Sequence, residues 1–200
     1  IWLTATARRS PFVTLKWASS LDGRAAANDG TSKWISGPES RTESHQRRAK
    51  VDAIMVGTGT VLADDPELTA RKPDATLFDH QPLRVIMGER DLPPGARVFN
   101  DSAETLQIKS RSIPAALDEL YSRGVRHLWV EGGPQLASDF VRQNLVDEFL
   151  IYLAPKLIGG PALAIRDIQV ASIDQAIDLE FIETKKLGAD MLIRAVNKEK

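Results

Sequence analysis

An apolar run, Ala53–Val56, is followed at once by the glycines and threonines of Gly57–Thr60. The run is too short for a helix and is apolar throughout, so it predicts a buried strand. A polar segment, Ser36–Lys50, precedes it and opens with Ser-Gly-Pro-Glu, which is typical of a helix start. Phe12–Ala18 alternates and is rich in strand formers, so it predicts a first strand. This strand–helix–strand order predicts a parallel pair of strands joined by a crossover.

The rest of the chain continues this alternation and then becomes rich in strands. Helices are expected over 113–123 and 135–143, and a surface loop is expected over 72–81. Further strands are predicted at Leu83–Gly88, Thr105–Ile108, His127–Val130, Glu148–Ala154, Leu179–Leu187 and Met191–Val196. Lys185–Asp190 resembles a hairpin turn. The expected class is α/β, with a mixed, mostly parallel central sheet flanked by helices and antiparallel C-terminal strands.

Size and charge limit the classes of function. Two hundred residues with 42% hydrophobic content suit a single domain over 1–200. The formal charge of -1 gives no overall field that would attract nucleic acid or an anionic membrane. No apolar run approaches the roughly 20 residues of a membrane span, and no secretory signal is apparent, so we expect a cytoplasmic protein. The chain has no cysteine, and His45, His80 and His127 lack ligand spacing, so no metal site is expected.

The segment Gly57–Arg71 is the first candidate site. Its glycines allow a phosphate-bearing ligand to approach the backbone, and Thr58 and Thr60 offer hydroxyl groups to it. Asp64 and Asp65 are adjacent acids, which repel each other in a cavity and so suit one of them to proton transfer. The arginine that ends the segment adds an anion clamp. The alternative is a loop whose aspartates cap backbone amides and whose threonines bind no ligand.

The second candidate site is Glu131–Pro134, where Gly132 and Gly133 join a predicted strand to a predicted helix. Unpaired amides and the positive end of a helix dipole favour a phosphate at such a place, for example a nucleotide pyrophosphate. The spacing is neither the Rossmann G-x-G-x-x-G nor a P-loop. A tight turn from strand to helix, without a ligand, is the alternative.

Other residues place charge or an aromatic ring where a site would use them. Lys16 is costly to bury without an acidic or phosphate partner, so it predicts a cavity wall unless it faces a sheet edge. Arg48, with Arg47 and Lys50, ends the polar helix and can bind a substrate phosphate or complement the helix dipole. Trp34 can stack on a planar ring or pack in the core or at its rim.

Together these residues resemble the reductase domain of the RibD family of bacterial riboflavin biosynthesis, which has the dihydrofolate-reductase-like fold. The resemblance runs from about Pro11 to Val196. Its ordered motifs are Leu15–Lys16 with Ser20–Arg24, Ser32–Ser36, Thr60–Pro66 with Leu68–Arg71, Trp129–Pro134, and Ala154–Gly160. The family's upstream deaminase half, with its zinc ligands, has no counterpart in the sequence, so deaminase activity is not expected.

The resemblance implies reduction of 5-amino-6-(5-phosphoribosylamino)uracil to the ribitylamino compound, with hydride passing from NADPH to the sugar C1′. With Thr58 and Gly132 added from the motifs above, the predicted cofactor residues are Ala18, Trp34, Thr58, Thr60, Asp64, Gly132, Gly133, Pro134, Gln135 and Leu136. The implied substrate residues are Ser32, Arg48, Leu68, Arg71 and Glu131, with the phosphate bound by the arginines. Lys16 is expected to line the same cavity, and Asp64 is the candidate for proton transfer.

The cofactor, the reaction and the assembly leave alternatives open. Glu89 stands where the family can place a small hydroxyl residue, and its charge would repel the 2′-phosphate of NADPH unless Arg90 compensates. The reaction alternatives are reduction of 2,5-diamino-6-ribosylamino-4(3H)-pyrimidinone 5′-phosphate, a dihydrofolate reductase, and a nonenzymatic pyridine-nucleotide-binding module. The strand-rich end of the chain predicts a homodimer.

Overall fold

A computed structural model of the chain describes residues 1–198, and these fall into two compact units. The first unit comprises residues 1–13 and 42–133, and the second comprises residues 14–41 and the chain from 134 onward. The strand β1 (Phe12–Ser20) and the helix α2 (Pro38–Arg48) each begin in one unit and end in the other.

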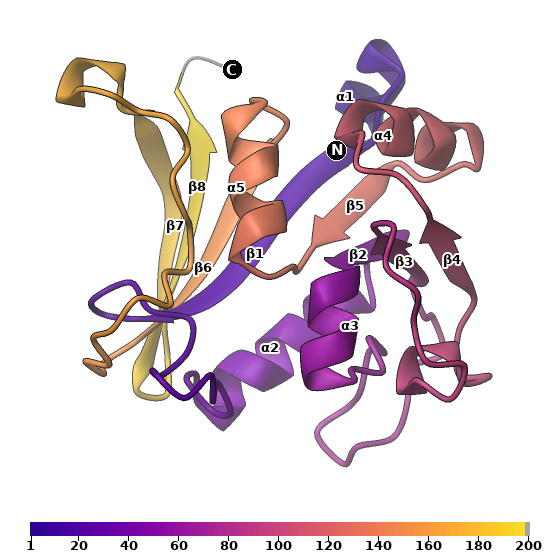
Figure 1. Ribbon diagram of the computed structural model, residues 1–200, viewed down its shortest axis with the longest axis horizontal. Helices are drawn as coiled ribbons and strands as arrows, with labels where there is room; N and C mark the ends of the chain where they lie inside the picture. The colour runs from indigo at the N-terminus through magenta and orange to yellow at the C-terminus, as the bar shows by residue number, and fades with distance from the viewer. Residues whose placement is uncertain (199–200) are drawn as a thin grey trace. The chain divides into compact units, whose positions relative to one another are not determined.

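The first unit is built on parallel strands in the order β4-β3-β2-β5 (Figure 1). These strands are β2 (Ala53–Gly57), β3 (Leu83–Met87), β4 (Thr105–Ile108) and β5 (His127–Val130). The helices of this unit, besides the end of α2, are α1 (Trp2–Arg8), α3 (Thr58–Asp64), α4 (Ile113–Ser122) and a 3-10 turn at Arg97–Phe99. The side chains of Ile54, Met55 and Val56 are fully buried, which is why this strand is a continuous apolar run in the sequence.

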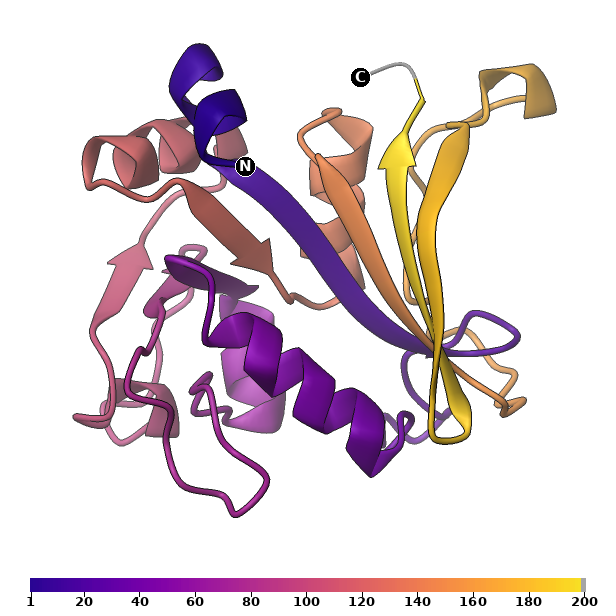
Figure 2. The same cartoon turned by 180° about the vertical axis from the view of Figure 1, so that it is seen from behind.

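The second unit is built on strands in the order β1-β6-β8-β7. It adds β6 (Glu148–Ala154), β7 (Leu179–Leu187), β8 (Asp190–Asn197), α5 (Pro134–Arg142) and a 3-10 turn at Ile173–Gln175. The strands β1 and β6 are parallel, whereas β8 is antiparallel to both β6 and β7. Figure 2 shows β7 and β8 as a long yellow hairpin with a tight turn, as the segment Lys185–Asp190 predicts.

The turn of this hairpin supplies the cap for the start of α2. Asp190 is 3% exposed, and its Oδ2 accepts hydrogen bonds of 2.6 Å from the Gly37 amide and 2.6 Å from the Ser40 hydroxyl. A carboxylate at this place satisfies amides that the first helical turn leaves unpaired and complements the positive end of the helix dipole. The β7–β8 hairpin therefore fixes the chain that leads from Ser36 into α2.

The structure confirms the expected α/β class, its antiparallel C-terminal strands, and the positions of the predicted strands to within a few residues. The structure differs from the sequence analysis in two places. The residues Thr58–Asp64 form the helix α3, which no sequence pattern predicts. The strands β1 and β2 do not pair, since β2 lies between β3 and β5. A crossover fixes the parallel direction of two strands but not how many strands it skips.

Candidate active site

The two candidate motifs meet in the first unit at the carboxyl ends of β2 and β5. These strands are parallel neighbours, so their carboxyl ends lie at the same edge. The Gly133 amide donates a hydrogen bond of 3.1 Å to Oγ1 of Thr60, across 73 residues of sequence. A Cβ atom on Gly133 would lie only 3.6 Å from the same oxygen. Ligands of open α/β sheets bind outside the carboxyl ends of the strands, so this junction is the candidate site.

Thr58 has a packing role at the same edge. It is 5% exposed, and an ideal Cβ on Gly88 would lie 2.7 Å from its Oγ1. Gly88 also has a φ of +131°, a backbone conformation that favours glycine. This packing agrees with the alternative in which Thr58 shapes the turn, and its contact with a cofactor stays a prediction.

The adjacent acids occupy different surroundings. Asp64 ends α3 and is exposed to solvent. Asp65 has a φ of 40°, and its Oδ1 accepts a hydrogen bond of 2.8 Å from the Arg97 amide. Asp65 thus caps a loop amide, as the alternative for this segment expects. Asp64 remains the candidate for proton transfer.

Arg48 and Glu131 form a charged pair in the first unit. Arg48 donates from Nε and Nη2 to Oε2 of Glu131 over 3.0 and 2.7 Å, and the two side chains are only 14% and 20% exposed. The same oxygen accepts a hydrogen bond of 3.0 Å from Nε1 of Trp129. Two of the predicted substrate residues are therefore held rigidly together by charge-assisted hydrogen bonds.

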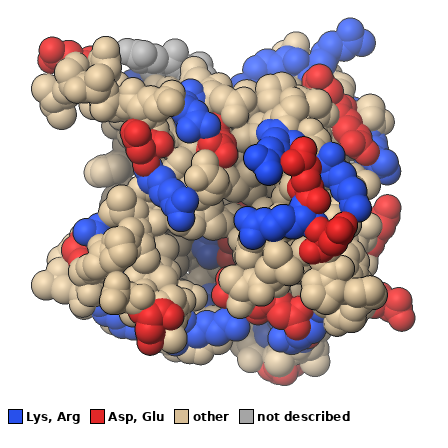
Figure 3. All heavy atoms as spheres, in the orientation of Figure 1, with Lys and Arg blue, Asp and Glu red and all other residues tan. Residues whose placement is uncertain are grey.

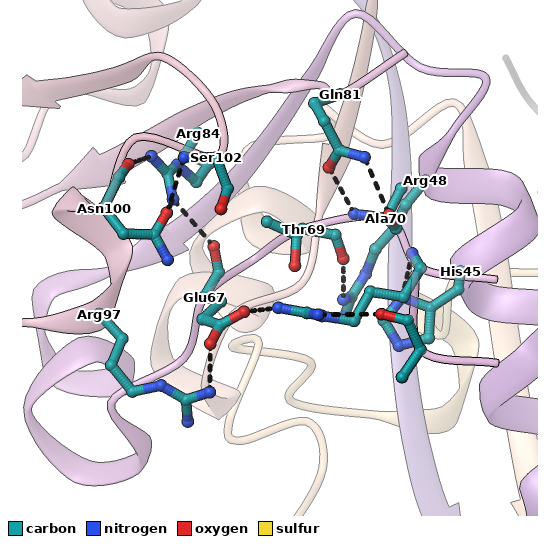
Figure 4. A network of polar contacts seen from close by, with 12 residues as sticks. His45, Arg48, Glu67, Thr69, Ala70, Gln81, Arg84, Arg97, Asn100 and Ser102 are labelled. Carbon is teal, nitrogen blue, oxygen red and sulfur yellow. Dashed lines mark hydrogen bonds and ion pairs between the residues drawn. The ribbon is translucent and has the colours of Figure 1, made fainter. Parts of the chain in front are cut away.

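Arg71 lies in a second charged group. Glu67 forms an ion pair with Arg97, and Figure 4 shows these two side chains pointing toward each other. Glu67 also forms an ion pair with Arg71, and Arg71 donates from Nη1 to the Ala75 carbonyl over 3.1 Å. The side chain of Arg71 is 33% exposed, so it is open to solvent at one side. Arg71, which is predicted to bind the substrate phosphate, is therefore held in place by its own contacts before any substrate binds.

A buried arginine anchors the loop that carries these residues. Arg84 is 1% exposed and donates to Oδ1 of Asn100 over 2.8 Å and to the Glu67 carbonyl over 3.3 Å. Burial lowers the pKa of Arg84. Beside Glu67, Leu68 has a φ of 56°, in the left-handed region that a branched residue adopts only when surrounding contacts hold it. Strained backbone of this kind is common at ligand sites.

His45, which is not among the site residues predicted from the sequence, contacts the backbone of Arg71. Its Nδ1 accepts a hydrogen bond of 3.3 Å from the Arg71 amide. Burial and then the nearby charge of Arg48 lower the pKa of His45 to about 4. The sequence does indicate this position, because His45 precedes Arg48 by three residues on a predicted helix and therefore lies on the same helix face.

Gly132 lies in the first unit, between Glu131 and Gly133. The other predicted site residues lie in the second unit, and these are Lys16, Ala18, Ser32, Trp34, Pro134, Gln135 and Leu136. Lys16 places its Nζ 5.5 Å from the centre of the Tyr152 ring, and Ala18 pairs with Tyr152 in the β1–β6 register. That these residues bind the same cofactor and substrate as the residues of the first unit stays a prediction.

Trp34 is not a core residue, since it is 62% exposed. The Arg41 guanidinium lies 4.4 Å from the centre of its ring, and Lys156 donates from Nζ to its carbonyl over 2.7 Å. The ring of Trp34 is therefore exposed to solvent, and the Arg41 cation packs against one of its faces.

Two motifs of the family resemblance contact each other in the second unit. Asp22 accepts hydrogen bonds from the Ser20 hydroxyl over 2.5 Å and from the amides of Ile158 and Gly159 over 3.1 and 2.7 Å. These bonds, that from Ser20 first, lower the pKa of Asp22 to about 2. Asp22 thus ties the turn after β1 to the loop after β6.

Helix α5 begins at Pro134 with polar contacts of its own. Gln135 donates from Nε2 to the Asp139 carboxylate over 3.2 Å and accepts a hydrogen bond of 3.3 Å from Nη1 of Arg166. Leu136 is half-buried on the same turn. Gln135 is therefore held by one contact within α5 and by one from Arg166 outside it.

Within residues 1–198, no helix has the length and apolar character needed to cross a bilayer. Over the same residues, no cluster of three or more histidine, cysteine, aspartate or glutamate side chains is arranged to hold a metal ion.

Comparison with known proteins identifies the family of the chain. The chain is 47% identical to the riboflavin biosynthesis protein RibD of Mycobacterium tuberculosis over 195 residues, which cover 98% of this chain and 57% of that protein. A crystal form of Acinetobacter baumannii RibD superposes with a TM-score of 0.89 at 29% identity, covering 98% of this chain and 60% of that one.

A third relative carries a more explicit description. A Thermotoga maritima protein described as a diaminohydroxyphosphoribosylaminopyrimidine deaminase/5-amino-6-(5-phosphoribosylamino)uracil reductase superposes with a TM-score of 0.86 at 26% identity, covering 98% of this chain and 59% of that one. The chain thus spans a little over half the length of these relatives. The family model described as the RibD C-terminal domain matches residues 11–193. The chain therefore belongs to the RibD C-terminal domain family.

Proposed function

We propose that the chain catalyses the NADPH-dependent reduction of 5-amino-6-(5-phosphoribosylamino)uracil to 5-amino-6-(5-phosphoribitylamino)uracil in riboflavin biosynthesis. The observation that carries the proposal is the 3.1 Å hydrogen bond from the Gly133 amide to the Thr60 hydroxyl. This bond joins the segment that contains Thr60 to the segment that contains Gly133, at one edge of one sheet. The family resemblance implies that both segments bind the cofactor. The description of the T. maritima relative supports the same reaction.

Bound NADPH supplies the hydride that C1′ of the sugar receives while the bond from C1′ to the ring oxygen breaks and that oxygen takes a proton. Asp64, exposed at the end of α3, is the residue that we assign to this proton. The Asp64→Asn variant is expected to bind NADPH as the wild type does and to lose turnover. Wild-type turnover in this variant would remove Asp64 from the mechanism.

The charges around Gly59 support NADPH over NADH. Nη2 of Arg90 would lie 3.3 Å from a Cβ atom on Gly59, so this guanidinium lies close to the backbone of the first candidate segment. Glu89 pairs with Arg111 over 3.0 Å, and this partner compensates the negative charge that would repel a 2′-phosphate. Arg90 is therefore the residue that we assign to the 2′-phosphate.

The substrate residues are proposed to recognise a phosphorylated sugar. Arg48 and Arg71 offer guanidinium groups, which bind phosphate oxygens through paired hydrogen bonds. Figure 3 shows basic and acidic side chains intermixed on one face of the molecule, so recognition of an anion depends on such local groups and not on an overall positive surface.

The pyrimidine and the assembly are parts of the same proposal. Parallel assays with the uracil compound and with 2,5-diamino-6-ribosylamino-4(3H)-pyrimidinone 5′-phosphate separate the two candidate substrates, and faster turnover of the uracil compound is expected. We also propose that the protein is cytoplasmic and that it forms a homodimer. β7 exposes Phe181 and Ile182 at 65% and 46%, and this apolar surface supports the dimer. A monomer by light scattering would refute the dimer.

A further inference from the structure

One edge of the segment Thr69–Arg71 is paired with the residues that follow it, through a bridge between Arg71 and Leu77 and through hydrogen bonds of Gln81, which Figure 4 shows beside Ala70. The Ala70 amide donates to Oε1 of Gln81 over 2.8 Å. The Ala70 carbonyl accepts from Nε2 of Gln81 over 2.8 Å and from the Phe78 amide over 3.1 Å. This edge of the segment is therefore paired in the manner of a β-strand.

The opposite edge is paired by side chains of α2 in place of a second strand. The Thr69 carbonyl accepts a hydrogen bond of 3.3 Å from Nη1 of Arg48, and the Arg71 amide donates one of 3.3 Å to Nδ1 of His45. The His45 ring also shares a hydrogen bond with the Thr69 backbone. Because His45 and Arg48 are three residues apart on one helix, both face the segment.

The acceptor role of His45 requires an unprotonated Nδ1. Burial, the charge of Arg48 and, more weakly, that of Arg71 lower the pKa of the ring, whereas Glu131 and the Thr69 backbone raise it, and the result is about 4. The ring is therefore neutral at neutral pH and accepts the amide hydrogen throughout that range.

We propose that His45 is a positioning residue for the substrate: through the Arg71 amide it sets the place of the Arg71 guanidinium and of Leu68. The inference rests on the proposed function, in which these two residues contact the substrate. Leu68 has a φ of 56°, so its backbone keeps this conformation only while its neighbours in the chain are held. His45 supplies one of these holding contacts.

The test compares His45→Ala with His45→Asn, whose Oδ1 can take the place of the accepting nitrogen. The Ala variant is expected to raise the KM for the phosphorylated uracil substrate on the order of tenfold, with a smaller change in kcat and unchanged NADPH affinity. The Asn variant is expected to recover most of the loss. His80→Ala is the matched control, because His80 bonds the Val51 carbonyl over 3.0 Å in the same unit, and its constants are expected to stay at wild-type values.

A wild-type KM in His45→Ala, equal loss of substrate and NADPH affinity, or no recovery in His45→Asn would each overturn the positioning role. If His45→Ala does not fold, His45→Leu, which also lacks an acceptor, replaces it in the same comparison. If the wild type itself reduces neither pyrimidine, the proposed function fails, and hydrogen exchange of the Arg71 amide decides the inference. Faster exchange in the Ala or Leu variant than in the wild type and His45→Asn supports it, and equal rates refute it.

Discussion

Arg48 and Glu131 lie 83 residues apart in the chain, yet two hydrogen bonds of 3.0 and 2.7 Å join their side chains. The pair connects the last turn of α2 to the residue that follows β5. Both residues are assigned to the substrate, so the charge balance of the pair matters to binding as well as to stability.

In the Glu131→Gln variant the Arg48 side chain stays mostly buried but loses its charge partner. We expect the free energy of unfolding to fall by about 2 to 3 kcal/mol, near the lower limit for removing one partner of a buried pair, since both side chains retain some exposure. Urea unfolding measures this loss. The control Glu119→Gln breaks the Arg123–Glu119 pair, which is 47% and 40% exposed, and is expected to change stability by less than about 0.5 kcal/mol. Equal effects of the two substitutions would contradict this account of the pair.

Thr60→Val removes the hydroxyl that accepts the Gly133 amide while keeping the shape of the side chain. Because that hydrogen bond holds the two cofactor motifs together, we expect NADPH affinity to fall on the order of fivefold to tenfold. Fluorescence titration with NADPH gives the value. Thr105→Val is the control, since it loses a 2.7 Å hydrogen bond to the Val98 carbonyl elsewhere in the same unit. Wild-type affinity for NADPH in Thr60→Val would refute the role of this hydrogen bond in cofactor binding.

Arg90→Ala tests the choice of cofactor. Loss of a guanidinium that pairs with the 2′-phosphate is expected to lower the preference for NADPH over NADH on the order of tenfold, with little effect on NADH itself. The measurement is kcat/KM for each cofactor. Lys109→Ala removes another exposed cation of the first unit, paired with Asp91 over 3.3 Å, and is expected to leave the preference unchanged. A preference that Arg90→Ala does not alter would place the 2′-phosphate elsewhere.

Much of the fold follows from local patterns. The strands Thr105–Ile108 and His127–Val130 lie where the sequence predicts them, because each is a short run bounded by polar or turn-forming residues. The helix α3 was missed because Gly59 lowers helix propensity and the helix has only 7 residues. Helix α1 (Trp2–Arg8) was also not predicted, and it too is a short helix.

The candidate site was predictable in its motifs and not in its contacts. Glycines and threonines at the ends of β2 and β5 indicated ligand-binding turns, and the Gly133–Thr60 bond brings these turns together. The partners of Arg48 and His45 depend instead on which strand lies next to which, and a helix pattern does not contain that information. The same holds for Asp190, whose role as a cap for α2 spans 150 residues or more.

His45 makes stability depend on pH. Its pKa is about 4 in the folded state against the ordinary histidine value of 6.5, so between these values the unfolded chain binds more protons. The folded state is therefore expected to lose stability as pH falls from 6.5 towards 4, with the full contribution present above 6.5. Urea unfolding across this range is expected to show a shallower pH slope in His45→Asn than in the wild type. Identical slopes would contradict the assignment.

The most direct test of the proposed reaction is NADPH oxidation by the purified chain on addition of 5-amino-6-(5-phosphoribosylamino)uracil. One NADPH is expected to be oxidised for each ribitylamino product formed, at a rate that falls in Thr60→Val and Glu131→Gln. NADPH that binds but is not oxidised with this substrate, or oxidation that yields no ribitylamino product, would contradict it.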